Sequence, residues 1–179
     1  MMNADKGLGI LFLVVFPFYG VGIELLESKS SPKLGFILVM LNSIVVFIIG
    51  LVINKLVNTF ISKVYLISRI IEAILLALSC CLLYTNDNVD RVYYQVAMVA
   101  LAVGSVPLFD ELKRNGRIPV WLGKFGVLAY IMLGVGIGVG VFVSEEMELY
   151  LMILGMMFEI TFAIWLLVHG FQAHGNKND

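Results

Sequence analysis

The chain has 179 residues, of which 60% are hydrophobic and only 14% are charged, with a formal net charge of −1. Soluble domains carry about 45–50% apolar and about 25% charged residues, so this composition excludes an ordinary water-soluble globule. It also excludes a disordered chain, which would be poor in aliphatic residues. The near-zero net charge leaves no basic footprint for nucleic acid. The composition therefore predicts a protein embedded in a membrane.

Six long apolar stretches follow one another along the chain. A membrane-spanning helix needs about 20 mostly apolar residues to cover about 30 Å of hydrocarbon, and each stretch is long enough. Short polar linkers separate the stretches, so sequential helices should run antiparallel. The predicted fold is all-α, with one domain over residues 1–179 that consists of six transmembrane helices. The predicted spans are residues 8–26, 34–56, 64–84, 92–112, 120–143 and 149–171.

The Lys and Arg residues are distributed unevenly between the two ends of the predicted bundle. With six alternating spans, eight of them fall on the side of the N-terminus and three on the opposite side. By the positive-inside rule, this asymmetry predicts that both termini are cytoplasmic, in a multi-pass protein of the cell membrane. The eight residues are Lys6, Lys55, Lys63, Lys113, Arg114, Arg117, Lys124 and Lys177.

Three charged residues lie inside the predicted spans, where a charge costs about 2.5–3.5 kcal/mol on insertion and usually faces the protein interior. Arg69 and Glu72 are three residues apart and share one face of their helix. Glu159 has Gly155 and Ala163 four residues away on either side, which predicts that a neighbouring helix comes close on this face.

Helical rise places these charges at one level of the membrane. At about 1.5 Å per residue, Glu72 and Glu159 lie about 13–15 Å from the edge that carries the termini. Asn42 and Ser43 fall at a similar depth in the second span. The sequence therefore predicts a polar cluster near the midplane, with the candidate ligand-binding residues Arg69, Glu72, Glu159, Asn42 and Ser43.

Two interpretations of this cluster stay open. In the first, the excess of carboxylates over guanidinium makes it a site that binds or passes a small molecule, a lipid-like compound or a proton. In the second, it is a structural ion network in an accessory subunit that docks a partner protein or another copy of the chain. The sequence contains no nucleophile–base pattern and no metal-ligand spacing, so we predict no catalytic residue, no metal site and no cofactor.

The fifth span contains four glycines at alternate positions, Gly134, Gly136, Gly138 and Gly140. They form two interleaved G-x-x-x-G pairs, a pattern that allows close packing of membrane helices. We predict that they face neighbouring helices. Pro17 in the first span can be either a packing feature or the mark of a transport site.

Several short motifs resemble those of one known family. Residues 116–122 (GRIPVWL), followed by Gly126, are similar to a short basic loop with I-P-x-W-L and a glycine. Residues 158–171 are similar to a closing F-E…W-L-x-x-K-G-F motif, with His169 at the usual basic position, and residues 68–72 (SRIIE) to an R-x-x-E helix. The chain thus resembles the small bacterial polytopic membrane proteins of domain-of-unknown-function family 4386. This resemblance implies a six-helix bundle in the bacterial inner membrane and supplies no known activity.

Overall fold

The computed structural model describes residues 4–85, 92–142 and 145–171, with the side chains of these ranges except 141–149. It contains six α-helices, each with a segment long and apolar enough to cross a membrane. This confirms the predicted all-α bundle, the architecture of a multi-pass membrane protein. Residues 86–91, between the third and fourth predicted spans, residues 143 and 144, and Lys177 lie outside the described residues. The helices are α1 (Ala4–Glu27), α2 (Pro32–Val57), α3 (Phe60–Thr85), α4 (Val92–Arg114), α5 (Val120–Phe142) and α6 (Glu145–Val168).

Several helices extend beyond the apolar stretches that predicted them. α1 begins at Ala4 rather than at residue 8, and α6 begins at Glu145 rather than at residue 149. A span predicted from hydropathy stops where polar residues begin. The helix itself continues through these residues, because it still pairs its own backbone N–H and C=O groups there.

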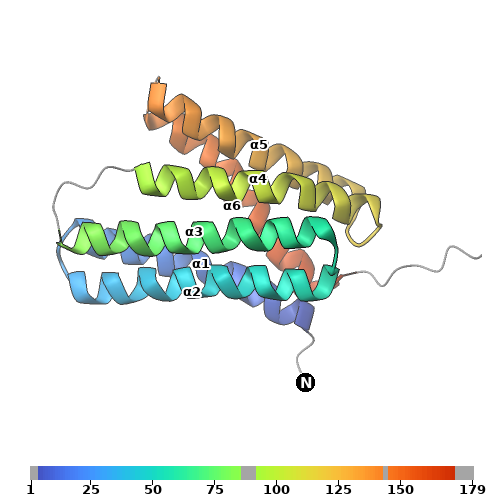
Figure 1. Cartoon of the computed structure of the whole chain (residues 1–179), viewed down its shortest axis with the longest axis horizontal. Helices are drawn as coiled ribbons and strands as arrows, with labels where there is room; N and C mark the ends of the chain where they lie inside the picture. Colours follow the sequence, from blue (N-terminus) through green and yellow to red (C-terminus); the bar gives the residue numbers. More distant parts are fainter. Residues whose placement is uncertain (1–3, 86–91, 143–144, 172–179) are drawn as a thin grey trace, which may run out of the picture.

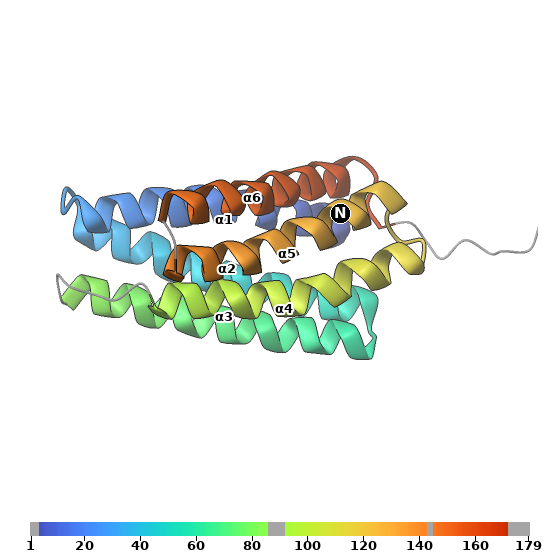
Figure 2. The ribbon, with the colours of Figure 1, turned by 90° about the horizontal axis from the view of Figure 1, so that it is seen from above.

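The six helices form a closed ring. Each helix packs against the next one along the chain, and α6 closes the ring against α1. Figure 2 shows α1 and α6 along one side of the bundle and α3 and α4 along the opposite side. The start of α1 and the end of α6 lie at the same end of the bundle (Figure 1). An even number of antiparallel helices requires this arrangement.

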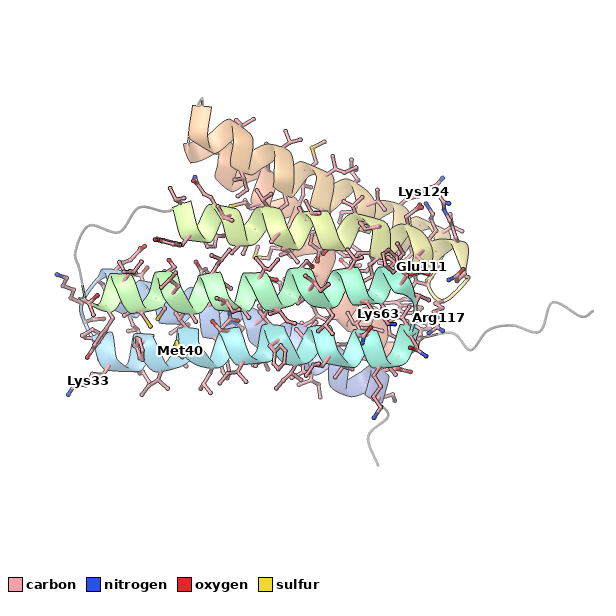
Figure 3. All side chains as sticks on the ribbon, viewed as in Figure 1. Lys33, Met40, Lys63, Glu111, Arg117 and Lys124 are labelled. Atoms are coloured by element: carbon pink, nitrogen blue, oxygen red, sulfur yellow. The ribbon has the colours of Figure 1, made fainter. Side chains whose placement is uncertain are left out.

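Side chains tie the turns together at the end that carries the termini. Thr59 Oγ1 donates a hydrogen bond to Glu111 Oε2 over 2.9 Å, which connects the α2–α3 turn to α4. Arg117 Nη1 donates to the backbone oxygen of Leu56 over 2.7 Å, which connects the α4–α5 turn to α2. Basic side chains gather here (Figure 3), so we name it the Lys/Arg-rich end: Lys63, Arg117 and Lys124 are labelled.

Four buried phenylalanines fill the interior of the ring next to this end. Phe12 of α1, Phe109 of α4, and Phe158 and Phe162 of α6 are at most 1% exposed. Their ring centroids lie 4.7–5.8 Å apart in stacked and edge-to-face pairs, the arrangements that aromatic quadrupoles favour. We name these four residues the aromatic plug, because they close the ring interior on this side.

Close helix contacts occur at glycines outside the predicted G-x-x-x-G pairs. A Cβ atom added at Gly35 of α2 would lie 2.6 Å from the backbone oxygen of Gly22 in α1. One added at Gly104 of α4 would overlap the side chain of Ser68 in α3. These small residues therefore let neighbouring backbones approach closely.

The predicted close packing is not shown at two of the alternate glycines of α5. A Cβ added at Gly134 would meet only the Cβ of Ala102, at 3.6 Å, which is ordinary contact. One added at Gly138 would meet nothing within 4 Å. At Gly138 the motif marks open space rather than a helix contact.

Candidate functional site

The three predicted charges meet inside the ring. Arg69, Glu72 and Glu159 are 2%, 3% and 8% exposed. Arg69 Nη1 donates to Glu72 Oε2 over 2.9 Å, and Arg69 Nη2 lies 3.7 Å from Glu159 Oε1. Because α3 and α6 are not neighbours in the ring, the second ion pair crosses its interior. Helical rise placed the three charges at one depth, and the structure also brings them into contact.

Two tyrosines, which the sequence analysis missed, complete the network. Arg69 Nε donates to Tyr65 Oη over 2.6 Å, and Tyr130 Oη of α5 donates to Glu159 Oε1 over 2.6 Å. The Arg69 guanidinium also lies 5.0 Å from the centre of the Tyr65 ring, within reach of a cation–π attraction. Tyr65 precedes Arg69 by one helical turn, so i, i+4 spacing could have found it. Nothing in the sequence indicates Tyr130.

A cavity of about 350 Å³ adjoins this network. The volume lies within the range of about 300–1,000 Å³ that is typical of small-molecule sites. On α1 the lining residues follow the aromatic plug, from Val15 to Gly20, and on α6 all of them except Glu159 precede it, from Met152 to Met156. The cavity therefore lies on the side of the plug away from the Lys/Arg-rich end.

Four of the five predicted site residues line this cavity, and Ser43 does not. Ser43 is buried, but its hydroxyl donates to the backbone oxygen of Val39 in the same helix over 3.1 Å. Ser43 therefore lies outside the cavity lining, and its assignment to the site stays a prediction. Asn42 and Ser43 share a depth, yet consecutive residues of a helix do not face the same way. We name the polar lining residues the polar floor: Asn42, Arg69, Glu72, Tyr130 and Glu159.

Two buried atoms of the polar floor lack a hydrogen-bond partner among the described residues, Arg69 Nη2 and Asn42 Oδ1. The 3.7 Å between Arg69 Nη2 and Glu159 is too long for a hydrogen bond. A buried polar atom without a partner costs about 1–3 kcal/mol. One of these atoms is a donor and the other an acceptor, and both belong to residues that line the cavity.

The polar floor combines one guanidinium with two carboxylates. When both Glu72 and Glu159 are ionised, its net charge is −1. Neither a sealed ion pair nor a neutral hydrogen-bonded core has this excess. A proton or the hydrogen-bond donor of a bound molecule can compensate it.

The predicted close approach around Glu159 is present on one side only. A Cβ added at Gly9 of α1 would lie 2.8 Å from the backbone oxygen of Ala163, so α1 does come close there. At Gly155 an added Cβ would meet nothing within 4 Å, and this residue lines the cavity. The expectation of a close helix at Gly155 is therefore wrong, because the glycine leaves space for the cavity.

Comparisons with known proteins give no match to this chain, whether with family models, curated proteins or solved structures.

Proposed function

We propose that this protein binds a small molecule inside the membrane, in the cavity above the polar floor. The observation that supports this is the position of the buried charges. Arg69, Glu72 and Glu159 lie at the wall of a 350 Å³ cavity rather than in a filled core. A purely structural polar network is stabilising when every member is satisfied, and here Arg69 Nη2 and Asn42 Oδ1 are left over.

The aromatic plug favours binding over passage through the protein. Its four rings occupy the ring interior between the cavity and the Lys/Arg-rich end. A molecule bound at the polar floor would have to displace several fully buried side chains to continue in that direction. Uptake of a proton by one of the two carboxylates remains part of the proposal, because it removes the excess negative charge.

The Gly155→Leu variant tests this function against a matched control. If a molecule co-purifies with the wild-type protein in mild detergent, the amount bound should fall by about tenfold or more in this variant, because leucine fills the space that the molecule needs. Gly138→Leu is the control, since its Cβ also meets nothing within 4 Å but the residue does not line the cavity. Native mass spectrometry of both variants measures the bound mass. Equal retention in the two variants would contradict the proposal.

The alternative function is that of a structural or accessory subunit. Two observations favour it: the 2.9 Å bond from Arg69 to Glu72 and the 2.6 Å bond from Tyr130 to Glu159, which joins α5 to α6. In this interpretation the polar floor only fixes helices, and a partner protein or a second copy docks outside.

Glu159→Gln separates the two functions. The amide has nearly the same shape and can still accept the hydrogen bond of Tyr130, so the fold should stay intact. The loss of one charge should change the amount of retained molecule, measured by native mass spectrometry. A variant that fails to insert or fold, while Glu27→Gln at the exposed end of α1 behaves as wild type, would favour the structural function.

We further propose that both termini are cytoplasmic and that the chain belongs to domain-of-unknown-function family 4386 of the bacterial inner membrane. The position of Lys63, Arg117 and Lys124 at the end with the termini supports the orientation. The motif residues Arg69, Glu72 and Glu159 all belong to the polar floor, which supports a common site. Accessibility of single cysteines placed at both ends tests the orientation.

A further inference from the structure

We propose that the cavity opens sideways to the bilayer between α1 and α6, and that its occupant is a single-chain apolar molecule with a hydroxyl head. This inference rests on the proposed function and specifies its ligand class and its route of entry.

The cavity reaches the outer surface at one seam. Among its lining residues, the exposed ones are Gly20 of α1 and Ile153 and Met156 of α6. The other lining residues are buried or half-buried. α1 and α6 face each other where Gly9 meets Ala163 and Leu167. Gly20 lies about three helical turns after Gly9, Met156 about two turns before Ala163, and Ile153 about one turn before Met156, so the exposed residues lie on the sides that the two helices turn to each other.

Glycines leave space on both sides of this seam. A Cβ added at Gly20 or at Gly155 would meet nothing within 4 Å. Pro17 lies one turn before Gly20, and its missing N–H leaves the carbonyl of Leu13 without its helical donor. The α1 side of the seam is therefore both uncovered and less rigidly held than a regular helix.

The seam lies at the depth of the hydrocarbon. Gly20 is 16 residues from the start of α1, or about 24 Å at 1.5 Å per residue. Met156 is 12 residues from the end of α6, or about 18 Å. Next to them, Val21 and Met157 are also exposed. A molecule that arrives at this seam therefore comes from lipid rather than from water.

Aromatic side chains close the cavity along the bundle axis. The aromatic plug closes the side of the Lys/Arg-rich end. Towards the other end, Tyr19 of α1 and Tyr94 of α4 stack at 5.7 Å and also line the cavity. Because α1 and α4 are not neighbours in the ring, this stack crosses its interior. Among the described residues, the seam is therefore the way in that is left open to a molecule with an alkyl chain.

The unpaired atoms of the polar floor determine which polar head group such a molecule can carry. Arg69 Nη2 needs an acceptor and Asn42 Oδ1 needs a donor, and a hydroxyl group supplies both. A carboxylate head offers no donor and adds a third negative charge next to Glu72 and Glu159. An ammonium head would compensate the net charge of −1, but it offers no acceptor to Arg69 Nη2, which would stay unpaired. The tail would lie against the apolar lining, which includes Val15, Phe16, Leu76, Leu133 and Met152.

Photolabelling in phosphatidylcholine nanodiscs tests the head. The probes are a long-chain alcohol, a carboxylic acid and a primary amine that share one diazirine-bearing chain and are loaded into the bilayer. Peptide mapping should find the alcohol on α1 and α6 at about tenfold higher yield than the other two, the range expected for one charge-assisted hydrogen bond. Asn42→Leu should remove this preference, whereas Gly138→Leu should keep it. Equal labelling by the three probes would overturn the hydroxyl assignment.

Labelling rates test the route. Gly20→Trp should slow labelling of the cavity residues by the alcohol about tenfold, because the indole covers the seam at its exposed edge. Gly138→Trp adds the same bulk away from the seam and should label at the wild-type rate. If the wild type binds the alcohol and Gly20→Trp does not slow it, the route is wrong while the proposed function stands. If no probe reaches the cavity and no molecule co-purifies with the wild type, the proposed function fails as well.

Discussion

Replacing Arg69 with methionine is expected to destabilise the folded protein by about 3–5 kcal/mol, the usual cost of removing one partner from a buried ion pair. Methionine keeps much of the volume but leaves Glu72 and Glu159 as two buried carboxylates without a counter-ion. It also removes the bonds to Glu72 at 2.9 Å and to Tyr65 at 2.6 Å. Unfolding in mixed micelles of mild detergent and sodium dodecyl sulfate measures the change in the free energy of unfolding.

A variant that also neutralises the carboxylates shows the origin of this cost. Arg69→Met combined with Glu72→Gln and Glu159→Gln should recover most of the lost stability, because no uncompensated charge remains in the ring. The double variant with Glu72→Gln alone should recover less, since Glu159 keeps its charge. A triple variant as unstable as Arg69→Met would assign the cost to the lost cation–π and hydrogen-bond contacts instead.

The same network explains why a cavity can persist inside this ring. The contacts of Arg69 with Glu159 and of Tyr130 with Glu159 link α3, α5 and α6 across the interior. They fix the distance between helices on opposite sides of the ring without filling it with side chains. On the side of the Lys/Arg-rich end the aromatic plug packs densely, and on the other side Gly155 adds no side chain. The polar floor therefore both lines the cavity and holds apart the helices that surround it.

The sequence predicted the depth of the site but not its direction. Hydropathy predicted all six spans, because about 20 apolar residues have few other stable environments. Helical rise then placed Arg69, Glu72, Glu159 and Asn42 at one level, and the structure brings them to one cavity. Helical rise gives only the position of a residue along the helix axis. The rotation of each helix depends on its neighbours, which is why helical rise does not separate Ser43, outside the cavity lining, from Asn42, and why it does not indicate Tyr130.

Glycine patterns in a single sequence carry even less information about packing. The predicted pairs in α5 include Gly134 and Gly138, which make no close helix contact, whereas Gly35 and Gly104 make the tight ones. A glycine allows a close approach but does not require it. Which glycine is used depends on the helix opposite, and no pattern within α5 contains that information.

Gly104→Ala and Gly138→Ala should therefore change stability in opposite directions. At Gly104 the new methyl group would overlap the side chain of Ser68, and overpacking of this kind costs about 1–3 kcal/mol. At Gly138 nothing lies within 4 Å. There the higher helix propensity of alanine should stabilise the protein by about 0.5–1 kcal/mol. Unfolding of both variants under identical detergent conditions gives the comparison.

The strain at Gly104 should also reach the polar floor, because Ser68 precedes Arg69 and donates to the backbone oxygen of Tyr65 over 2.7 Å. A shift of Ser68 would therefore displace the helical turn that contains Tyr65 and Arg69. The exchange Gly104→Ala with Ser68→Gly removes the overlap, since the next atom, Tyr65 Cα, would lie 3.4 Å from the new Cβ. The exchange should restore most of the stability, short of the cost of about 0.5–1 kcal/mol for a glycine inside α3. If it is no more stable than Gly104→Ala, contact with Ser68 does not set the spacing of α3 and α4.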